Sequence, residues 1–223
     1  MRISYSRPGT DSLVLDFAAD SQDAVPPLDR VRIAAPHLGR LREPRAALLG
    51  YLLVRDLVGN RLEFRGIRIP TFLAGSILRQ SAQPELFVEG LTNAVEALAP
   101  RAGARLLAWG VRPTDAETAA EPAVEPAAEA GMLRVTADAL GYRIAGDGAA
   151  CEIRSNLRLF LALAARRPDE VEPAALALLA CDLLGASRLH AGPSEPGGGV
   201  PPGLAALLGD VGFSLEAPAE AAA

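Results

Sequence analysis

Few side chains in this sequence suggest a chemical role by their type and spacing. Asp182 is the only charged residue in the apolar stretch 174–185, where burial would raise the pKa of a lone carboxyl group. A carboxyl group in such surroundings is a candidate catalytic acid or base, with His37 and His190 as further candidate proton carriers. The alternative, which we favour, is structural: Asp182 lies at the solvent edge of a helix or pairs with a core arginine such as Arg158.

Metal and redox chemistry have little support in the sequence. His37 and His190 lie far apart, as do Cys151 and Cys181, and no spacing is typical of a zinc site. Both cysteines fall in apolar patterns, where a thiol usually serves as a small hydrophobic group. We therefore predict no metal site and no disulfide framework.

The chain contains no lysine, and all 22 of its basic residues are arginine. A lysine Schiff base, a Walker A phosphate loop and the lysine of the protein kinases are therefore excluded. No serine lies in a G-x-S-x-G motif, and the glycine clusters at 146–148 and 197–199 lack the strand and helix that a nucleotide-binding loop requires. No cofactor is predicted, and whether the protein is an enzyme stays open.

Arginines are concentrated between residues 28 and 69, which hold nine of them against four acidic residues. Guanidinium groups bind phosphate and carboxylate with two parallel hydrogen bonds, so neighbouring arginines on strands could hold an anionic ligand. A solvated face that pairs with Glu43, Asp56 and Glu63 is the simpler interpretation. The candidate ligand-binding residues project from two predicted strands: Arg30, Arg32, Arg61, Arg65 and Arg68.

The distribution of charge indicates how the chain is organised. The net charge of −5 arises from a segment at 114–131 with five acids and no base, and from an acidic end at 210–223. The first segment is rich in Ala, Glu and Pro and lacks the apolar surface of a folded element. We predict one domain built from 1–113 and 132–209 and interrupted by a mobile insertion, with a ragged C-terminal tail. Two domains, split at the insertion, are the alternative.

The residues around which the rest is organised lie between 44 and 79. Apolar residues cover nearly the whole surface of a predicted helix from Pro44 to Val58, so this helix must be buried. The strand 61–69 that follows changes its alternation at Gly66, which indicates a bulge. Pro70 begins a second helix.

The remaining patterns complete a mixed sheet. They predict a hairpin at 2–6 and 12–17, strands at 30–34, 105–111, 132–136, 141–145 and 150–155, and helices at 85–99, 156–165, 168–185 and 204–208. The fold class is therefore α+β, a mixed sheet covered by four to five helices. The order strand–helix–helix occurs at residue 61 and again at residue 150, but it is common, so no duplication is inferred.

For function we expect a non-catalytic accessory or binding subunit of a bacterial cytoplasmic assembly, with a protein partner or a second copy as its partner. The alternatives are an enzyme or binder that holds a small anionic molecule through arginines, and a nucleic-acid-binding protein that uses the 28–69 tract. Scarce aromatic residues argue against nucleic acid. No apolar run reaches the roughly 18 residues of a membrane span, so a membrane is not expected.

Overall fold

The computed structural model of the protein describes residues 1–80, 85–93, 105–109, 114–115, 132–146, 148–164, 168–191 and 200–216. The first part of the chain forms β1 (Arg2–Gly9), β2 (Ser12–Ala18), β3 (Arg30–Ala34), the short 3-10 helix η1 (Leu38–Arg40), α1 (Glu43–Val54), β4 (Arg61–Pro70), α2 (Thr71–Gln80) and β5 (Glu85–Thr92). The second part forms β6 (Arg105–Trp109), β7 (Thr114–Asp115), β8 (Met132–Asp138), β9 (Gly141–Gly146), β10 (Ala149–Ser155), α3 (Leu157–Ala164), α4 (Pro168–Leu184), β11 (Ala186–Ala191), α5 (Pro202–Asp210) and β12 (Ser214–Glu216).

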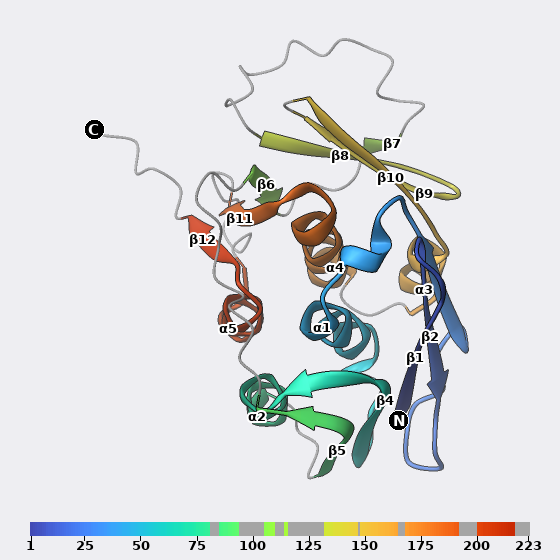
Figure 1. Ribbon diagram of the computed structural model, residues 1–223. Helices are drawn as coiled ribbons and strands as arrows, with labels where there is room; N and C mark the ends of the chain where they lie inside the picture. The colour runs from blue at the N-terminus through green and yellow to red at the C-terminus, as the bar shows by residue number, and fades with distance from the viewer. Residues whose placement is uncertain are drawn as a thin grey trace.

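The strands pair in the order β12-β11-β6-β8-β9-β10-β3-β2-β1-β4-β5, and β7 pairs with β8. Both parallel and antiparallel pairs occur, so the predicted α+β class with a mixed sheet is confirmed. The strands curve around α1 and α4, which lie at the centre of the molecule (Figure 1). Helices α2 and α5 contact each other and connect the two ends of the strand order, because α2 also contacts β5 and α5 contacts β12.

The predicted burial of the first long helix is confirmed. Every residue of α1 except Glu43 is buried, and α1 packs against α4 and β4. Burying a leucine such as Leu48 or Leu49 contributes about 1.5–3 kcal/mol, so these two central helices supply much of the stability of the core. α4 begins at Pro168, the start that was expected for this helix, and its residues 174–181 are all buried.

The bulge predicted at Gly66 is also confirmed. Gly66 has a φ of 70°, in the left-handed region, and the register between β4 and β5 shifts between Phe64 and Arg68. A Cβ atom at position 66 would lie 2.4 Å from the carbonyl oxygen of Tyr5. The close approach of β1 and the backbone conformation therefore both require glycine at this position.

The helix predicted over 85–99 is wrong in its first half. Residues 85–92 form β5, which runs parallel to β4, and residues 94–99 lie outside the described part of the chain. Side chains of β5 alternate between exposed and half-buried positions, and Phe87 and Leu91 of the predicted helical stripe are exposed. A segment this short fits the period of a helix as well as that of a strand, and pairing with β4 decides in favour of the strand.

The chain contains two repeats of one order of elements. The first is β1-β2-β3-α1-β4-α2-β5, with η1 inserted before α1, and the second is β8-β9-β10-α4-β11-α5-β12, with α3 inserted before α4. In both, three antiparallel strands precede a helix and two parallel strands that are joined through a further helix. In addition, β6 pairs with β11 in parallel, as β1 pairs with β4.

The two repeats contact each other through equivalent elements. β3 pairs with β10, α1 packs against α4, and α2 packs against α5. Contacts between equivalent elements are the pattern that two halves related by a two-fold axis would make. This duplication was not inferred from the sequence, where strand 61–65 was compared with strand 150–154. In the structure β4 corresponds to β11, and the matching sequences are Asp56-Leu-Val-Gly59 and Asp182-Leu-Leu-Gly185.

The acidic segments are described only in part. Of the predicted insertion, Thr114 and Asp115 form β7, and residues 116–131 lie outside the described residues. Within the expected C-terminal tail, Val211 and Phe213 are buried and β12 pairs with β11, whereas residues 217–223 are not described.

Candidate functional site

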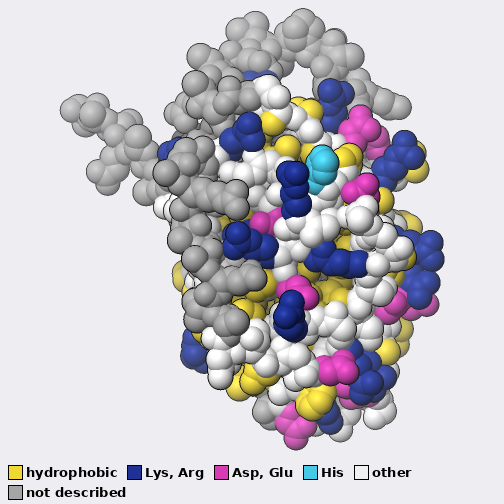
Figure 2. Space-filling model, viewed as in Figure 1, with side chains coloured by type: hydrophobic (Ala, Val, Ile, Leu, Met, Phe, Trp, Pro, Cys, Tyr) yellow, Lys and Arg dark blue, Asp and Glu magenta, His cyan; other side chains and the backbone are white. Residues whose placement is uncertain are grey.

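Two adjoining hollows lie beside η1, on the face that is shown in Figure 2. The smaller has a volume of about 460 Å³ and the larger about 830 Å³. Arg40 and Arg42 line both, so the two hollows form one continuous cleft, which we call the η1 cleft. The smaller is also lined by Arg7, Gly39, Leu41, Glu43, Pro44, Arg68, Pro70 and Thr92, and the larger by Arg45, Arg105, Ala149, Cys181, Asp182, Leu183, Leu184, Gly185 and Ser187.

The η1 cleft is strongly basic. Among the described residues, six arginines and two acidic residues line it, which gives this part of the lining a formal charge of +4 in a chain whose net charge is −5. Basic side chains are spread over the middle of the face that carries η1 (Figure 2). A positive lining in an acidic protein creates a local potential that attracts anions.

Asp182 anchors the inner wall of the cleft. Its carboxylate pairs with the guanidinium group of Arg45 and accepts a hydrogen bond of 2.8 Å from the backbone N–H of Arg42. The Arg45 side chain is 5% exposed and that of Asp182 is 8% exposed, so the pair is buried. Arg45 also donates from Nε to the carbonyl oxygen of Val211. These contacts agree with the structural role that we favoured for Asp182, but its partner is Arg45 and not Arg158.

The outer arginines differ in how far they are engaged. Arg7 donates to the carbonyl oxygens of Leu38, Gly39 and Leu41, so it holds η1 in place. Arg68 pairs with Glu43 at 2.9 Å. Arg40 is exposed, and in the described part of the chain no acidic side chain pairs with it. Arg40 is therefore available to a ligand.

The far wall comes from two neighbouring parallel strands, β6 and β11. Arg105 begins β6, where its Nη1 donates to the carbonyl oxygen of Leu184 at 2.6 Å. The register between the strands shifts between Ala186 and Arg188, so Ser187 lies at a bulge. Neither the Nε atom of Arg105 nor the Oγ atom of Ser187 has a hydrogen-bond partner, although both atoms are buried.

The arginine face that the sequence suggested is not assembled. Strands β3 and β4 are separated by β2 and β1, so Arg30 and Arg32 do not lie beside the arginines of β4. Arg30 pairs with Asp16, and the guanidinium group of Arg61 lies 5.3 Å from the ring centre of Phe87. Of the five candidate arginines only Arg68 lines the cleft.

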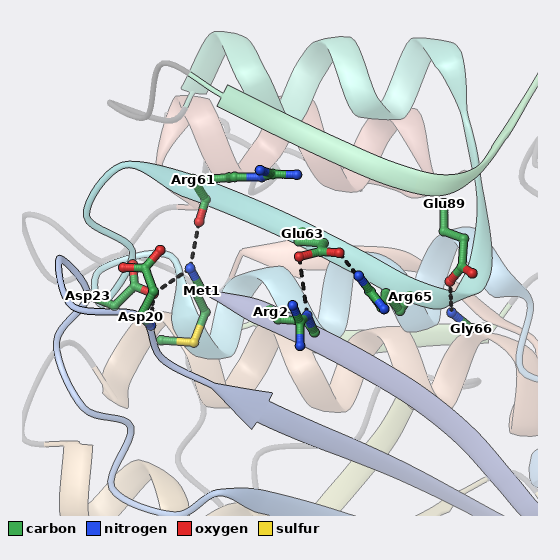
Figure 3. Close-up of polar contacts among 9 residues, drawn as sticks. All are labelled: Met1, Arg2, Asp20, Asp23, Arg61, Glu63, Arg65, Gly66 and Glu89. Carbon is green, nitrogen blue, oxygen red and sulfur yellow. Dashed lines mark hydrogen bonds and ion pairs between the residues drawn. The ribbon is translucent and has the colours of Figure 1, made fainter.

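Arg65 belongs to a separate cluster on β1 and β4. Glu63 accepts hydrogen bonds from Arg65 on the same strand, β4, and from Arg2 on the neighbouring strand, β1 (Figure 3). Burial alone would raise the pKa of Glu63, but these two bonds outweigh it and lower the pKa below its ordinary value. In the same view, the amino group of Met1 donates a hydrogen bond to the carbonyl oxygen of Arg61 and forms an ion pair with the carboxylate of Asp23.

His37 is not among the described residues that line the cleft. His37 precedes η1 with a φ of 63°, is exposed, and donates its backbone N–H to Asp11. His190 lies on β11, and its side chain is outside the described residues. Groups whose pKa is clearly raised lie elsewhere and have structural causes: burial raises the pKa of Tyr5, and burial followed by the bond to Glu172 raises that of Tyr142.

Comparison with known proteins gives no functional lead. No protein-family model matches the chain, and no curated protein or solved structure matches it either. No cluster of three or more His, Cys, Asp or Glu side chains suited to a metal ion occurs among the residues the structure describes. In the same part of the chain, no helix is long and apolar enough to cross a membrane.

Sequence reasoning missed most of the cleft. Arg40, Arg42, Arg105 and Ser187 were not candidates, although Arg40 and Arg42 belong to the dense basic tract. The run Arg40-Leu-Arg-Glu-Pro-Arg45, directly before a buried helix, was the available signal. Arg105 and Ser187 carried none, because only the pairing of β6 with β11 brings them to the same place.

Proposed function

We propose that this protein is a binding protein that holds an anionic group of its ligand in the η1 cleft. The observation that carries the proposal is the formal charge of +4 on the cleft lining in a chain with a net charge of −5. Arg40 adds a guanidinium group that is exposed and free of ion pairs among the described residues. Arginine binds phosphate and carboxylate with paired hydrogen bonds, which fits an anion better than any neutral ligand.

Binding fits the cleft better than proton transfer does. Asp182, the only candidate acid or base in the larger hollow, is engaged by Arg45 and by the N–H of Arg42. Both of its carboxylate oxygens already accept hydrogen bonds, one from Arg45 and one from Arg42, so the geometry favours a structural role over proton transfer. We therefore assign Asp182 a structural role in the wall of the cleft and Arg40 the role of binding the ligand.

Titration calorimetry with the full chain at low salt tests the proposal, with citrate and inorganic phosphate as probes. Arg40→Gln should weaken binding about tenfold, since a hydrogen bond to a charged group contributes about 1.5–3 kcal/mol. Arg143→Gln is the matched control, because it removes the same charge from an exposed position on β9, outside the cleft. Equal weakening by the two variants would reduce the effect to net charge, and absence of any binding would reject the proposal.

A second candidate function is that of an accessory subunit that binds a further strand. β5 lies at one end of the strand order, and in the described residues no strand pairs with its outer edge. Phe87 and Leu91 on β5 are 44% and 56% exposed, and an apolar edge strand is a template for strand addition. If a second copy adds its own β5 there, light scattering should show a dimer that Leu91→Glu abolishes. A monomer at all concentrations would count against this candidate.

A further inference from the structure

We infer that the larger hollow of the η1 cleft is a binding subsite for the phosphate group of a small phosphomonoester, with Arg105 and Ser187 as its inner ligands. This inference rests on the proposed function and specifies the anion. Two buried polar atoms without a partner, the Nε atom of Arg105 and the Oγ atom of Ser187, lie on residues that line this hollow. Buried donors without a partner are rare, because each loses its hydration without any compensation.

The guanidinium group of Arg105 is fixed in the orientation that a phosphate requires. Its Nη1 atom is bound to the carbonyl oxygen of Leu184, and the backbone N–H of Arg105 donates to Gly185. The Nε–H and the adjacent Nη2–H of a guanidinium group point in parallel, and this pair of donors matches two oxygens of a phosphate. The bond to Leu184 is made by Nη1, and the Nε atom of that pair has no hydrogen-bond partner.

Ser187 supplies a donor from a different direction. The bulge in β11 removes Ser187 from the regular register between Ala186 and Arg188, and the residue is 5% exposed. A hydroxyl group can donate to a third phosphate oxygen, whereas a carboxylate has only two oxygens, both of which the fork of Arg105 would occupy. The parallel donors of Arg105 together with the hydroxyl group of Ser187 favour an anion with three or more oxygens, such as phosphate, over a carboxylate.

Charge and volume define the rest of the ligand. Asp182 contacts both Arg45 and Arg42, and the described lining of the larger hollow, with four arginines and this one acidic residue, keeps a formal charge of +3 to balance the two negative charges of a phosphomonoester. At about 830 Å³ the hollow exceeds the size of a phosphate ion, and Ala149, Leu183 and Leu184 add apolar wall. These walls suit an organic group attached to the phosphate.

The subsite joins the two repeats of the chain. Arg40 and Arg42 belong to the first repeat, whereas Arg105 and Ser187 belong to β6 and β11 on the side of the second. A phosphate bound between them bridges the halves, so binding should raise the unfolding temperature of the whole chain.

The experiment is titration calorimetry and thermal unfolding of the full chain with phenyl phosphate, inorganic phosphate and benzoate. Phenyl phosphate should bind most tightly, and Ser187→Ala should weaken it at least fivefold. Because the Ser187 hydroxyl has no internal partner, the same variant should keep the unfolding temperature of the ligand-free protein. Ser76→Ala is the control, since Ser76 is buried in α2 outside the cleft and accepts a bond from Arg79.

The outcomes separate this inference from the proposed function. Unchanged phenyl phosphate affinity in Ser187→Ala, with affinity lost in Arg40→Gln, overturns the subsite and leaves the anion-binding cleft. Equal affinity for benzoate and phenyl phosphate overturns the phosphate assignment, and equal affinity for inorganic phosphate overturns the organic one. A marked fall in the ligand-free unfolding temperature of Ser187→Ala shows an internal role for the hydroxyl group and also refutes the inference. No binding of any probe by the unaltered chain rejects both proposals.

Discussion

The pair of Asp182 and Arg45 is the feature of the cleft whose removal should have the largest effect on stability. Both side chains are under 10% exposed, and Asp182 also accepts the N–H of Arg42 at the start of α1. Asp182→Ala leaves the Arg45 guanidinium buried without a counter-charge, which typically costs about 3–5 kcal/mol. For a chain of this size each kcal/mol lowers the unfolding temperature by about 2–4 °C. The expected fall is therefore about 6–20 °C.

A double-mutant cycle separates the cost of an unpaired charge from the value of the pair. Replacing both partners, as in Arg45→Met with Asp182→Leu, removes the two charges together and should recover most of the lost stability. Urea unfolding of the two single variants and the double variant gives the interaction free energy directly. If Asp182→Ala costs less than about 1 kcal/mol, water reaches the pair and the buried wall of the cleft is wrongly described.

Three further substitutions test the description of strand β4 and helix α2. Gly66→Ala places a side chain at a left-handed φ against the carbonyl oxygen of Tyr5, and should cost about 2 kcal/mol or more in urea unfolding. Gly75→Ala, in the interior of α2, brings a Cβ atom to 3.4 Å from Nη1 of the flexible Arg79 side chain, and should instead be neutral or stabilise by up to about 1 kcal/mol. Glu63→Gln should cost about 1 kcal/mol at pH 7, because Arg65 and a second arginine hold the folded-state pKa of Glu63 below its ordinary value. That stabilisation is complete above about pH 5 and is lost as the pH falls through the folded-state pKa, so the difference between variant and unaltered protein should vanish in acid. A difference that is constant with pH would contradict the role given to the charge.

Local patterns predicted the centre of this fold because they depended on single segments. The helix that is apolar on all sides and the bulge at Gly66 are both found, since burial on every face and a break in alternation each leave a mark in sequence. The segment 85–92 was assigned to a helix because eight residues fit the period of a helix and that of a strand equally well. Its partner strand β4 is distant in the sequence: the paired residues Arg61 and Glu85 lie 24 positions apart. Only the tertiary contact decided between the two.

The site was predicted less well than the fold, for a related reason. Asp182 stood out because a carboxylate in an apolar run is rare, and it does line the cleft. Its partner Arg45 could not be chosen from the sequence, since the two residues lie 137 positions apart and several arginines were equally possible. The donors of Arg105 and Ser187 that have no partner lie beside a bulge between β6 and β11, and no local pattern in either strand predicted this bulge.

The two repeats differ at the residue that anchors the inner wall of the cleft. Asp56 and Asp182 occupy matching places in the two Asp-Leu-x-Gly sequences, one after α1 and one at the end of α4. Asp56 lies beside Arg55 with its side chain 41% exposed, whereas Asp182 is 8% exposed and holds Arg45 of the other repeat. The two positions therefore carry the same charge, but only the second buries it against an arginine of the other repeat. Because Arg40 and Arg42 line the larger hollow together with Arg105 and Ser187, a ligand held between these two pairs contacts both halves of the chain.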